Sequence, residues 1–168
     1  MSLPIYPVVT MTVDDMVMYQ TDPTLVNSKT QLTTLEQIAA LIEVKQVHAI
    51  ALSDETTPLT GASSTVPLAT FHMPYDFNVT EVKAGLTAAG GGALLVTCDI
   101  QDDSVSILST AITIDAGEKT SATAATPPVL GANPRLIAAD SLVELFLQQV
   151  DTDNTAAGLK IYLIGNVA

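Results

Sequence analysis

The pattern of hydrophobic and polar residues divides the chain near Gln46. Before that point, short apolar bursts between residues 11 and 26 are broken by acidic turn residues, a pattern typical of two short strands. The segment TTLEQIAALI then repeats apolar residues every three or four positions and opens with threonines that accept hydrogen bonds from the first N–H groups of a helix. The pattern therefore predicts a small β-β-α module over residues 1–46. The buried stripe of its helix consists of Leu35, Ile38, Leu41 and Ile42.

A helix of about ten residues is only marginally stable alone. We therefore expect the helix to dock on the two strands before it or on a neighbouring molecule.

From Val47 onward nearly every segment alternates apolar and polar residues, and Gly, Pro and Asp mark turns between the segments. About eight strands at such spacing predict an antiparallel β-sandwich of jelly-roll kind over residues 47–168. The expected strands lie near 47–53, 64–73, 78–88, 92–101, 104–114, 119–126, 141–150 and 159–165.

Two segments leave alternatives open. LVELFLQQV has the spacing of a helix, but its length and flanking turns favour a strand with Val143, Leu145 and Leu147 on one face. TSATAATPPVLGANP, from Thr120 to Pro134, is expected to be an extended strand that leads into a long loop. This loop either packs on a neighbouring subunit or lies exposed.

The stretch MPYDFNV concentrates bulky side chains at a corner marked by a proline. Pro74 fits a position between two strands where no backbone donor is needed. We expect Tyr75 and Phe77 to fill the open end of the sandwich, where the sheets separate and small residues leave a gap.

Composition limits the classes of partner. Hydrophobic residues make up 48% of the chain and charged residues 14%, which indicates large buried areas, subunit contacts included. The formal net charge of −12 argues against nucleic acid, because too few cations are present to neutralise phosphates.

The start of the sequence lacks the pattern of a secretion signal, and no apolar run approaches the ~20 residues of a membrane span. We expect a soluble protein that is synthesised in a cytoplasm and has no membrane partner.

Residues that carry chemistry are few. His48 and His72 lie in predicted strands without a cysteine or second histidine at metal-ligand spacing, so we expect partly buried, hydrogen-bonded side chains. Cys98 lies in an apolar run and is expected to be a buried, inert thiol. Gly90-Gly91-Gly92 is expected to be a hairpin turn. No catalytic residue, cofactor site or metal site is predicted.

Two acidic clusters are interpreted as solvated turns. They are Asp99 to Asp103 and Asp151 to Asn154. The second is rich in oxygen ligands, so surface Ca²⁺ is an alternative, but it lacks the glycine and the distant glutamate of an EF-hand loop.

Four segments, SDETT, FHMPYDFNVTEVKAGL, ILSTAITIDAGEKTS and GLKIYLIG, occur in this order within residues 48–165. In order and spacing they resemble a β-sandwich domain of tailed-bacteriophage virion structural proteins, found in capsid decoration, head-fibre, collar and tail-fibre proteins. Residues 11–42, with TTLEQIAAL, are similar to a β-β-helix module near the start of phage fibre and receptor-binding proteins.

The resemblance implies a homotrimeric virion protein that contacts the major capsid protein or other virion proteins, with residues 1–46 as an anchoring module. Small size and the lack of a long stalk favour a capsid cement or decoration protein on the head. The alternative is a neck, collar or tail-fibre adaptor or receptor-binding component that recognises host carbohydrate. An enzyme such as a depolymerase is the third hypothesis. The candidate interface and anchoring residues are Leu35, Ile38, Leu41, Ile42, His72, Tyr75 and Phe77. In a trimer, His72 would alternatively meet its symmetry mates near the three-fold axis.

Overall fold

The computed structural model describes residues 45–168, which form one compact unit. The predicted β-β-α module, with Leu35, Ile38, Leu41 and Ile42, lies outside the described residues. The described part is mainly β, as predicted, with antiparallel sheets. Its strands are β1 (Gln46–Ala51), β2 (Ala69–His72), β3 (Phe77–Gly85), β4 (Val96–Asp102), β5 (Val105–Ser106), β6 (Leu108–Thr110), β7 (Ile112–Ile114), β8 (Val129–Leu130), β9 (Arg135–Ile137), β10 (Leu142–Gln149) and β11 (Lys160–Val167), and a 3₁₀ helix, η2, spans Ser121–Thr123.

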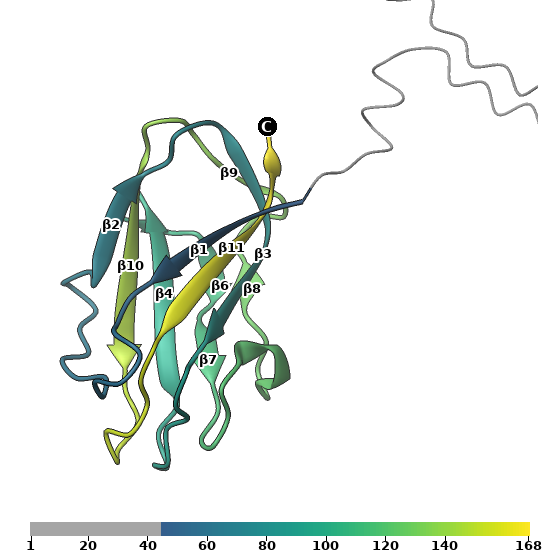
Figure 1. Cartoon of the computed structure of the whole chain (residues 1–168). Coiled ribbons are helices and arrows are strands. Elements are labelled where there is room, and N and C mark those ends of the chain that lie inside the picture. The colour runs from purple at the N-terminus through teal and green to yellow at the C-terminus, as the bar shows by residue number, and fades with distance from the viewer. Residues whose placement is uncertain (1–44) are drawn as a thin grey trace, which may run out of the picture. The chain divides into compact units, whose positions relative to one another are not determined.

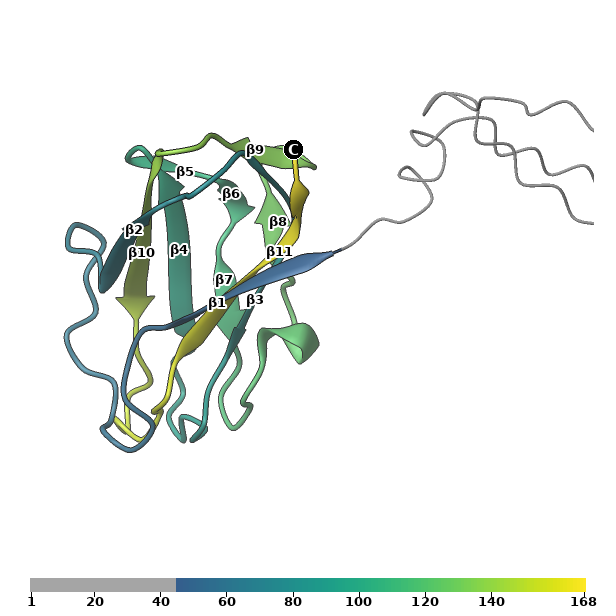
Figure 2. The same ribbon diagram turned by 45° about the horizontal axis from the view of Figure 1, so that its top comes forward.

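The strands form two larger sheets that lie face to face, as Figure 1 shows. The first sheet has the order β1-β11-β3-β9, and the second has the order β2-β10-β4-β5, with β7 also paired to β4. Strands β6 and β8 form a separate two-stranded ribbon. Figure 2 shows the C-terminus and β9 at one end of the sheets, and the loops that follow β3, β7 and β10 at the other.

Side chains that alternate along the strands fill the space between the two sheets. The inward residues of β10 are Val143, Leu145 and Leu147, so LVELFLQQV is a strand with the predicted face turned to the core. Phe146 lies on the opposite face of β10 and is also buried. The other inward residues of the long strands are Phe77, Val79, Val82, Ala84, Val96, Cys98, Ile100, Ile161 and Leu163.

A β-bulge between β3 and β11 shifts the alternation of β3. Glu81 pairs with Ile164 and Val79 pairs with Gly165, so Thr80 is the extra residue. A Cβ on Gly165 would lie 1.9 Å from the carbonyl oxygen of Asn78, so only glycine allows the two backbones to come this close. The bulge keeps both halves of β3 facing the core, with Val79 buried before it and Val82 after it.

The region from residue 104 to residue 137 differs from the prediction. The expected strand 104–114 is divided into β5, β6 and β7, and the expected strand 119–126 is a loop that contains η2. Ser121 explains the second difference, because its buried hydroxyl accepts a hydrogen bond from the N–H of Ala84 and so occupies the edge of β3 in place of a strand. The segment expected to be a long loop contains β8, and β9 follows directly after it.

Strand β2 is shorter than the predicted strand 64–73. Only Ala69–His72 pairs continuously with β10. The chain before β2 touches β10 through single hydrogen bonds, from the N–H of Ser63 to the carbonyl of Leu147 and from the N–H of Leu68 to the carbonyl of Leu145. Ser63 also accepts hydrogen bonds from the N–H groups of Thr65 and Val66, which holds this segment in a turn.

Candidate interaction surface

The outer face of the first sheet carries a row of apolar side chains along its edge. Strand β1 is this edge, and in residues 45–168 it pairs only with β11. The register places Val47 opposite Ile164, Ala49 opposite Tyr162 and Ala51 opposite Lys160. Because Ile161 and Leu163 of β11 point into the core, Tyr162 and Ile164 point outward.

We call the five outward residues Val47, Ala49, Ala51, Tyr162 and Ile164 the β1–β11 strip. The three residues from β1 are exposed, with Val47 at 56%, and the two from β11 are half-buried. An edge strand presents unpaired backbone groups that readily pair with another chain. The strip therefore combines apolar side chains with a strand edge that has no pairing partner among residues 45–168.

Strand β1 is held on the sheet by a cluster of polar and aromatic side chains at its start. The hydroxyl of Tyr75 donates a hydrogen bond to Oε1 of Gln46 at 2.9 Å. Its oxygen lies 3.1 Å from Nε2 of His48. Since the single hydroxyl proton is directed to Gln46, the same oxygen accepts the N–H of His48. The two bonds connect β1 to the corner that precedes β3. We call Gln46, His48 and Tyr75 the Tyr75 cluster.

The ring of Phe77 lies beneath this cluster. Phe77 is fully buried, and its ring meets the imidazole of His48 edge to face, with centroids 4.8 Å apart. Tyr75 is half-buried and packs against the same core. Both residues fill the end of the sheets as the sequence predicted. Their role in an interface stays a prediction.

The third described candidate, His72, lies apart from this cluster. It ends β2 in the second sheet, opposite Leu142 of β10. Its side chain is exposed and not partly buried as predicted, and Nδ1 lies 2.8 Å from the carbonyl oxygen of Asp140. The structure therefore brings Tyr75 and Phe77 together with His48 and Gln46, and not with His72. The hydrogen bond predicted for His48 is confirmed, but its partner Tyr75, 27 positions further along the chain, was not predicted. Gln46 was missed because Tyr75 lies 29 positions away.

The expectation that both acidic clusters are solvated is wrong for Asp99, Asp102 and Asp151. Asp99 is buried and accepts a hydrogen bond from the hydroxyl of Ser106 at 2.6 Å. Asp151 is buried and accepts the N–H of Thr155 at 3.0 Å. The prediction that Gly90-Gly91-Gly92 forms a hairpin turn is wrong, because β3 before it and β4 after it lie in different sheets. A Cβ on Gly90 would lie 2.7 Å from Cβ of Asp151, so this glycine loop allows the carboxylate to be covered.

The neighbouring Asp102 is half-buried and joins the two sheets. Its carboxylate on β4 lies 3.3 Å from Nη2 of Arg135 on β9. It also accepts a hydrogen bond from the hydroxyl of Ser141. Asp103 is exposed, as expected, and bonds from the N–H of Leu142 and from Ser141 lower the pKa of its carboxyl.

Cys98 is fully buried, as predicted, and burial raises the pKa of its thiol to about 12. In the described part of the chain no three His, Cys, Asp or Glu side chains are grouped so that they would hold a metal ion. Within the same residues no helix is long and apolar enough to cross a membrane.

No protein-family model matches this chain, and neither a curated protein nor a solved structure matches it.

Proposed function

We propose that this protein is a non-enzymatic structural protein of a tailed-phage virion. It forms a homotrimer and binds the assembled lattice of the major capsid protein as a cement or decoration protein. Binding to the lattice and not to free coat protein stabilises the assembled head by mass action. The observation that carries the proposal is the β1–β11 strip, an apolar sheet edge held in place by the Tyr75 cluster.

The order of the strands supports a jelly-roll fold for residues 46–167. With β5, β6 and β7 counted as one interrupted strand and β8 set aside, eight strands remain. In chain order they form one sheet with the sequence 1-8-3-6 and another with the sequence 2-7-4-5. This is the connectivity of a jelly roll, an architecture common in viral capsid proteins. Because a fold alone does not determine function, the assembly role rests on the strip and on the resemblance of the sequence segments.

The charge of the protein supports an assembly held by apolar contacts. Each chain carries a formal charge of −12, so copies of the chain repel one another. Salt screens this repulsion and leaves apolar contacts in place. We expect the trimer to become more stable as the salt concentration rises.

Light scattering on the purified full chain tests the trimer. We expect a mass of three chains at micromolar concentration, and dissociation of the Val47→Asp variant, because the new carboxylate would be buried in the contact. Val105→Asp is the matched control, since Val105 is 60% exposed on β5 of the second sheet. A stable monomer of the unaltered chain, or equal dissociation of both variants, would contradict assembly through the strip.

The copy number in purified virions tests the location. A cement protein is present in numbers comparable with the coat protein. A few copies per particle would instead favour the neck, collar or tail-fibre alternative.

A further inference from the structure

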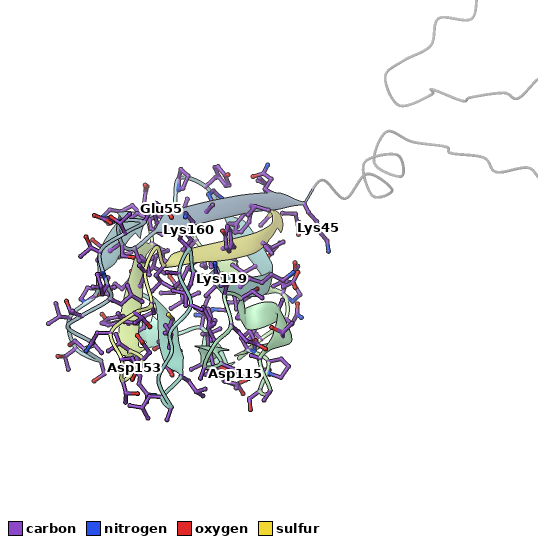
Figure 3. All side chains as sticks on the ribbon, turned by 60° about the horizontal axis from the view of Figure 1, so that its bottom comes forward. Lys45, Glu55, Asp115, Lys119, Asp153 and Lys160 are labelled. Atoms are coloured by element: carbon purple, nitrogen blue, oxygen red, sulfur yellow. The ribbon has the colours of Figure 1, made fainter. Side chains whose placement is uncertain are left out.

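Three of the five Lys and Arg residues in the described part of this acidic chain gather around one depression. Lys83, Lys119 and Lys160 line it together with Tyr162, and its volume is about 290 Å³. We call this depression the lysine basin. Figure 3 shows Lys119 and Lys160 next to each other, with Lys45 at a distance from both.

The register of the first sheet brings these side chains together. Lys160 of β11 lies opposite Gly85 of β3, and Tyr162 lies opposite Lys83. Lys119 comes from the loop before η2, and its carbonyl accepts the N–H of Leu86 at 2.8 Å. The strands and this backbone bond therefore fix three walls of the basin around Gly85.

The floor of the basin is open because residue 85 has no side chain. A Cβ on Gly85 would lie 3.6 Å from the carbonyl oxygen of Lys119 and 3.6 Å from the ring of Tyr162, which are ordinary contact distances. The fold therefore tolerates a side chain at this position. Gly158, which also lines the basin, differs, because it has φ of +68° and a Cβ there would collide with Thr87.

Two of the three ammonium groups have a carboxylate partner. Lys160 lies 2.5 Å from Glu55, and this bond together with one from Thr87 lowers the pKa of the Glu55 carboxyl. Lys83 lies 2.8 Å from Glu81, with both side chains more than 40% exposed.

Lys119 is exposed and makes no ion pair with any residue of the described range. Its neighbour in sequence, Glu118, accepts a hydrogen bond from the hydroxyl of Thr123. The hydroxyl of Tyr162 makes no hydrogen bond with the described residues, whereas that of Tyr75 makes two. The basin therefore offers one uncompensated positive charge beside an aromatic ring and an unused hydroxyl.

We propose that the lysine basin binds an acidic monosaccharide unit of a glycan, a uronic or sialic acid. Lys119 pairs with the sugar carboxylate, and the ring and hydroxyl of Tyr162 contact the body of the sugar. The volume lies near the lower limit for small-ligand pockets, which suits one sugar ring. An Asp or Glu side chain of a protein partner would leave most of it empty. This binding activity goes beyond the assembly role proposed above.

Titration of the purified full chain with methyl glucuronide and with N-acetylneuraminic acid tests the proposal, with calorimetry or NMR shifts as the readout. We expect a Kd of roughly millimolar for an isolated sugar, weakened by salt. Methyl glucoside, which lacks the carboxylate, is the neutral control and should not bind in the same range.

Two variants test the unpaired charge and the open floor of the basin separately. Lys119→Gln removes the unpaired charge, and Gly85→Val fills the floor with a residue that strands favour. Each should weaken binding of the acidic sugar at least about tenfold, the effect of ~1.4 kcal/mol. Lys45→Gln, which removes a cation outside the basin, should leave the Kd unchanged. Light scattering on each variant confirms that the oligomeric state has not changed.

Three results would overturn the proposal. Inorganic phosphate or acetate binding as tightly as the sugar acids would reduce the basin to a general anion site. A tetraglutamate peptide binding more tightly than either sugar would indicate a protein partner. Equal weakening by Lys45→Gln and Lys119→Gln would show that only the overall charge matters.

Discussion

The hydroxyl of Tyr75 is expected to hold the edge strand of the first sheet in place. Tyr75→Phe removes the donor to Gln46 and the acceptor for His48 and keeps the ring that packs on the core. The change is therefore a deletion of two hydrogen bonds with little loss of apolar contact. We expect lower stability and faster local opening of β1.

The size of the effect follows from the burial of the cluster. A single protein hydrogen bond contributes about 1 kcal/mol net, and the loss of two sets an upper value of about 2 kcal/mol. Gln46, His48 and Tyr75 are only half-buried, so water replaces part of what is lost. We expect a loss of about 1 kcal/mol in the free energy of unfolding, or about 3–5 °C in Tm for a unit of this size.

Thermal unfolding at one fixed protein concentration measures this change, and hydrogen exchange of the β1 amides locates it. Tyr162→Phe is the matched control, because Tyr162 is also half-buried and its hydroxyl bonds to nothing in the described range. We expect Tyr162→Phe to shift Tm by less than about 1 °C. Equal shifts for the two variants, or unchanged exchange in β1, would refute the role given to the Tyr75 cluster.

Three further predictions concern single residues. Gly165→Ala should lower the free energy of unfolding by at least about 2 kcal/mol in chemical denaturation, because the new Cβ would lie 1.9 Å from the carbonyl oxygen of Asn78. Gly131→Ala is the control and should lower it by less than about 0.5 kcal/mol, because its Cβ meets only a carbonyl oxygen at 3.5 Å. Cys98, with its thiol pKa raised to about 12, should resist a thiol reagent at pH 8 until the protein is unfolded. Hydrogen bonds from Thr56 and Thr57 lower the pKa of Asp54 from 3.8 to about 2. Their contribution to stability is therefore complete above about pH 4 and is lost as the pH falls to about 2. An NMR titration that gives an Asp54 pKa near 3.8 would contradict this prediction.

The sequence predicted the strands whose burial is set by simple alternation. β3, β4, β10 and β11 were found near their observed positions because each turns apolar residues toward one core. LVELFLQQV has a helix-like spacing because Phe146 on the outer face is covered as well, so both faces of this strand carry apolar residues. Its length and flanking turns favoured the strand, and the pairing with β2 and β4 confirms it.

The region around η2 was not predictable from local pattern. TSATAATPP has the composition of a strand followed by a loop, but Ser121 is fixed by a partner, Ala84, that lies 37 positions away. Strands of two or three residues such as β8 and β9 carry no detectable alternation of their own. β9 forms because the nine-residue strand β3 presents a free edge to it, and β8 forms by pairing with β6, which is itself only three residues long.

The candidate surfaces were hidden for a related reason. The lysine basin combines Lys83, Lys119 and Lys160, which are 36 and 41 positions apart in the sequence. Taken singly in the sequence, each of these lysines is interpreted as a solvated side chain. Only the antiparallel register of β3 and β11 shows that two of them share a face with Tyr162.

The β1–β11 strip and the lysine basin lie on the same outer face and share Tyr162, so assembly and ligand binding are physically linked. A trimer that covers the whole face would bury the basin and exclude the sugar. A trimer that covers only the β1 border would leave Lys119 and Gly85 open beyond the contact, because they lie on the β3 side of the first sheet. Titration of the trimer with the sugar acid separates these cases. If the contact covers the basin, raising the sugar acid concentration dissociates the trimer; if it stops at β11, the trimer binds the sugar with an unchanged mass.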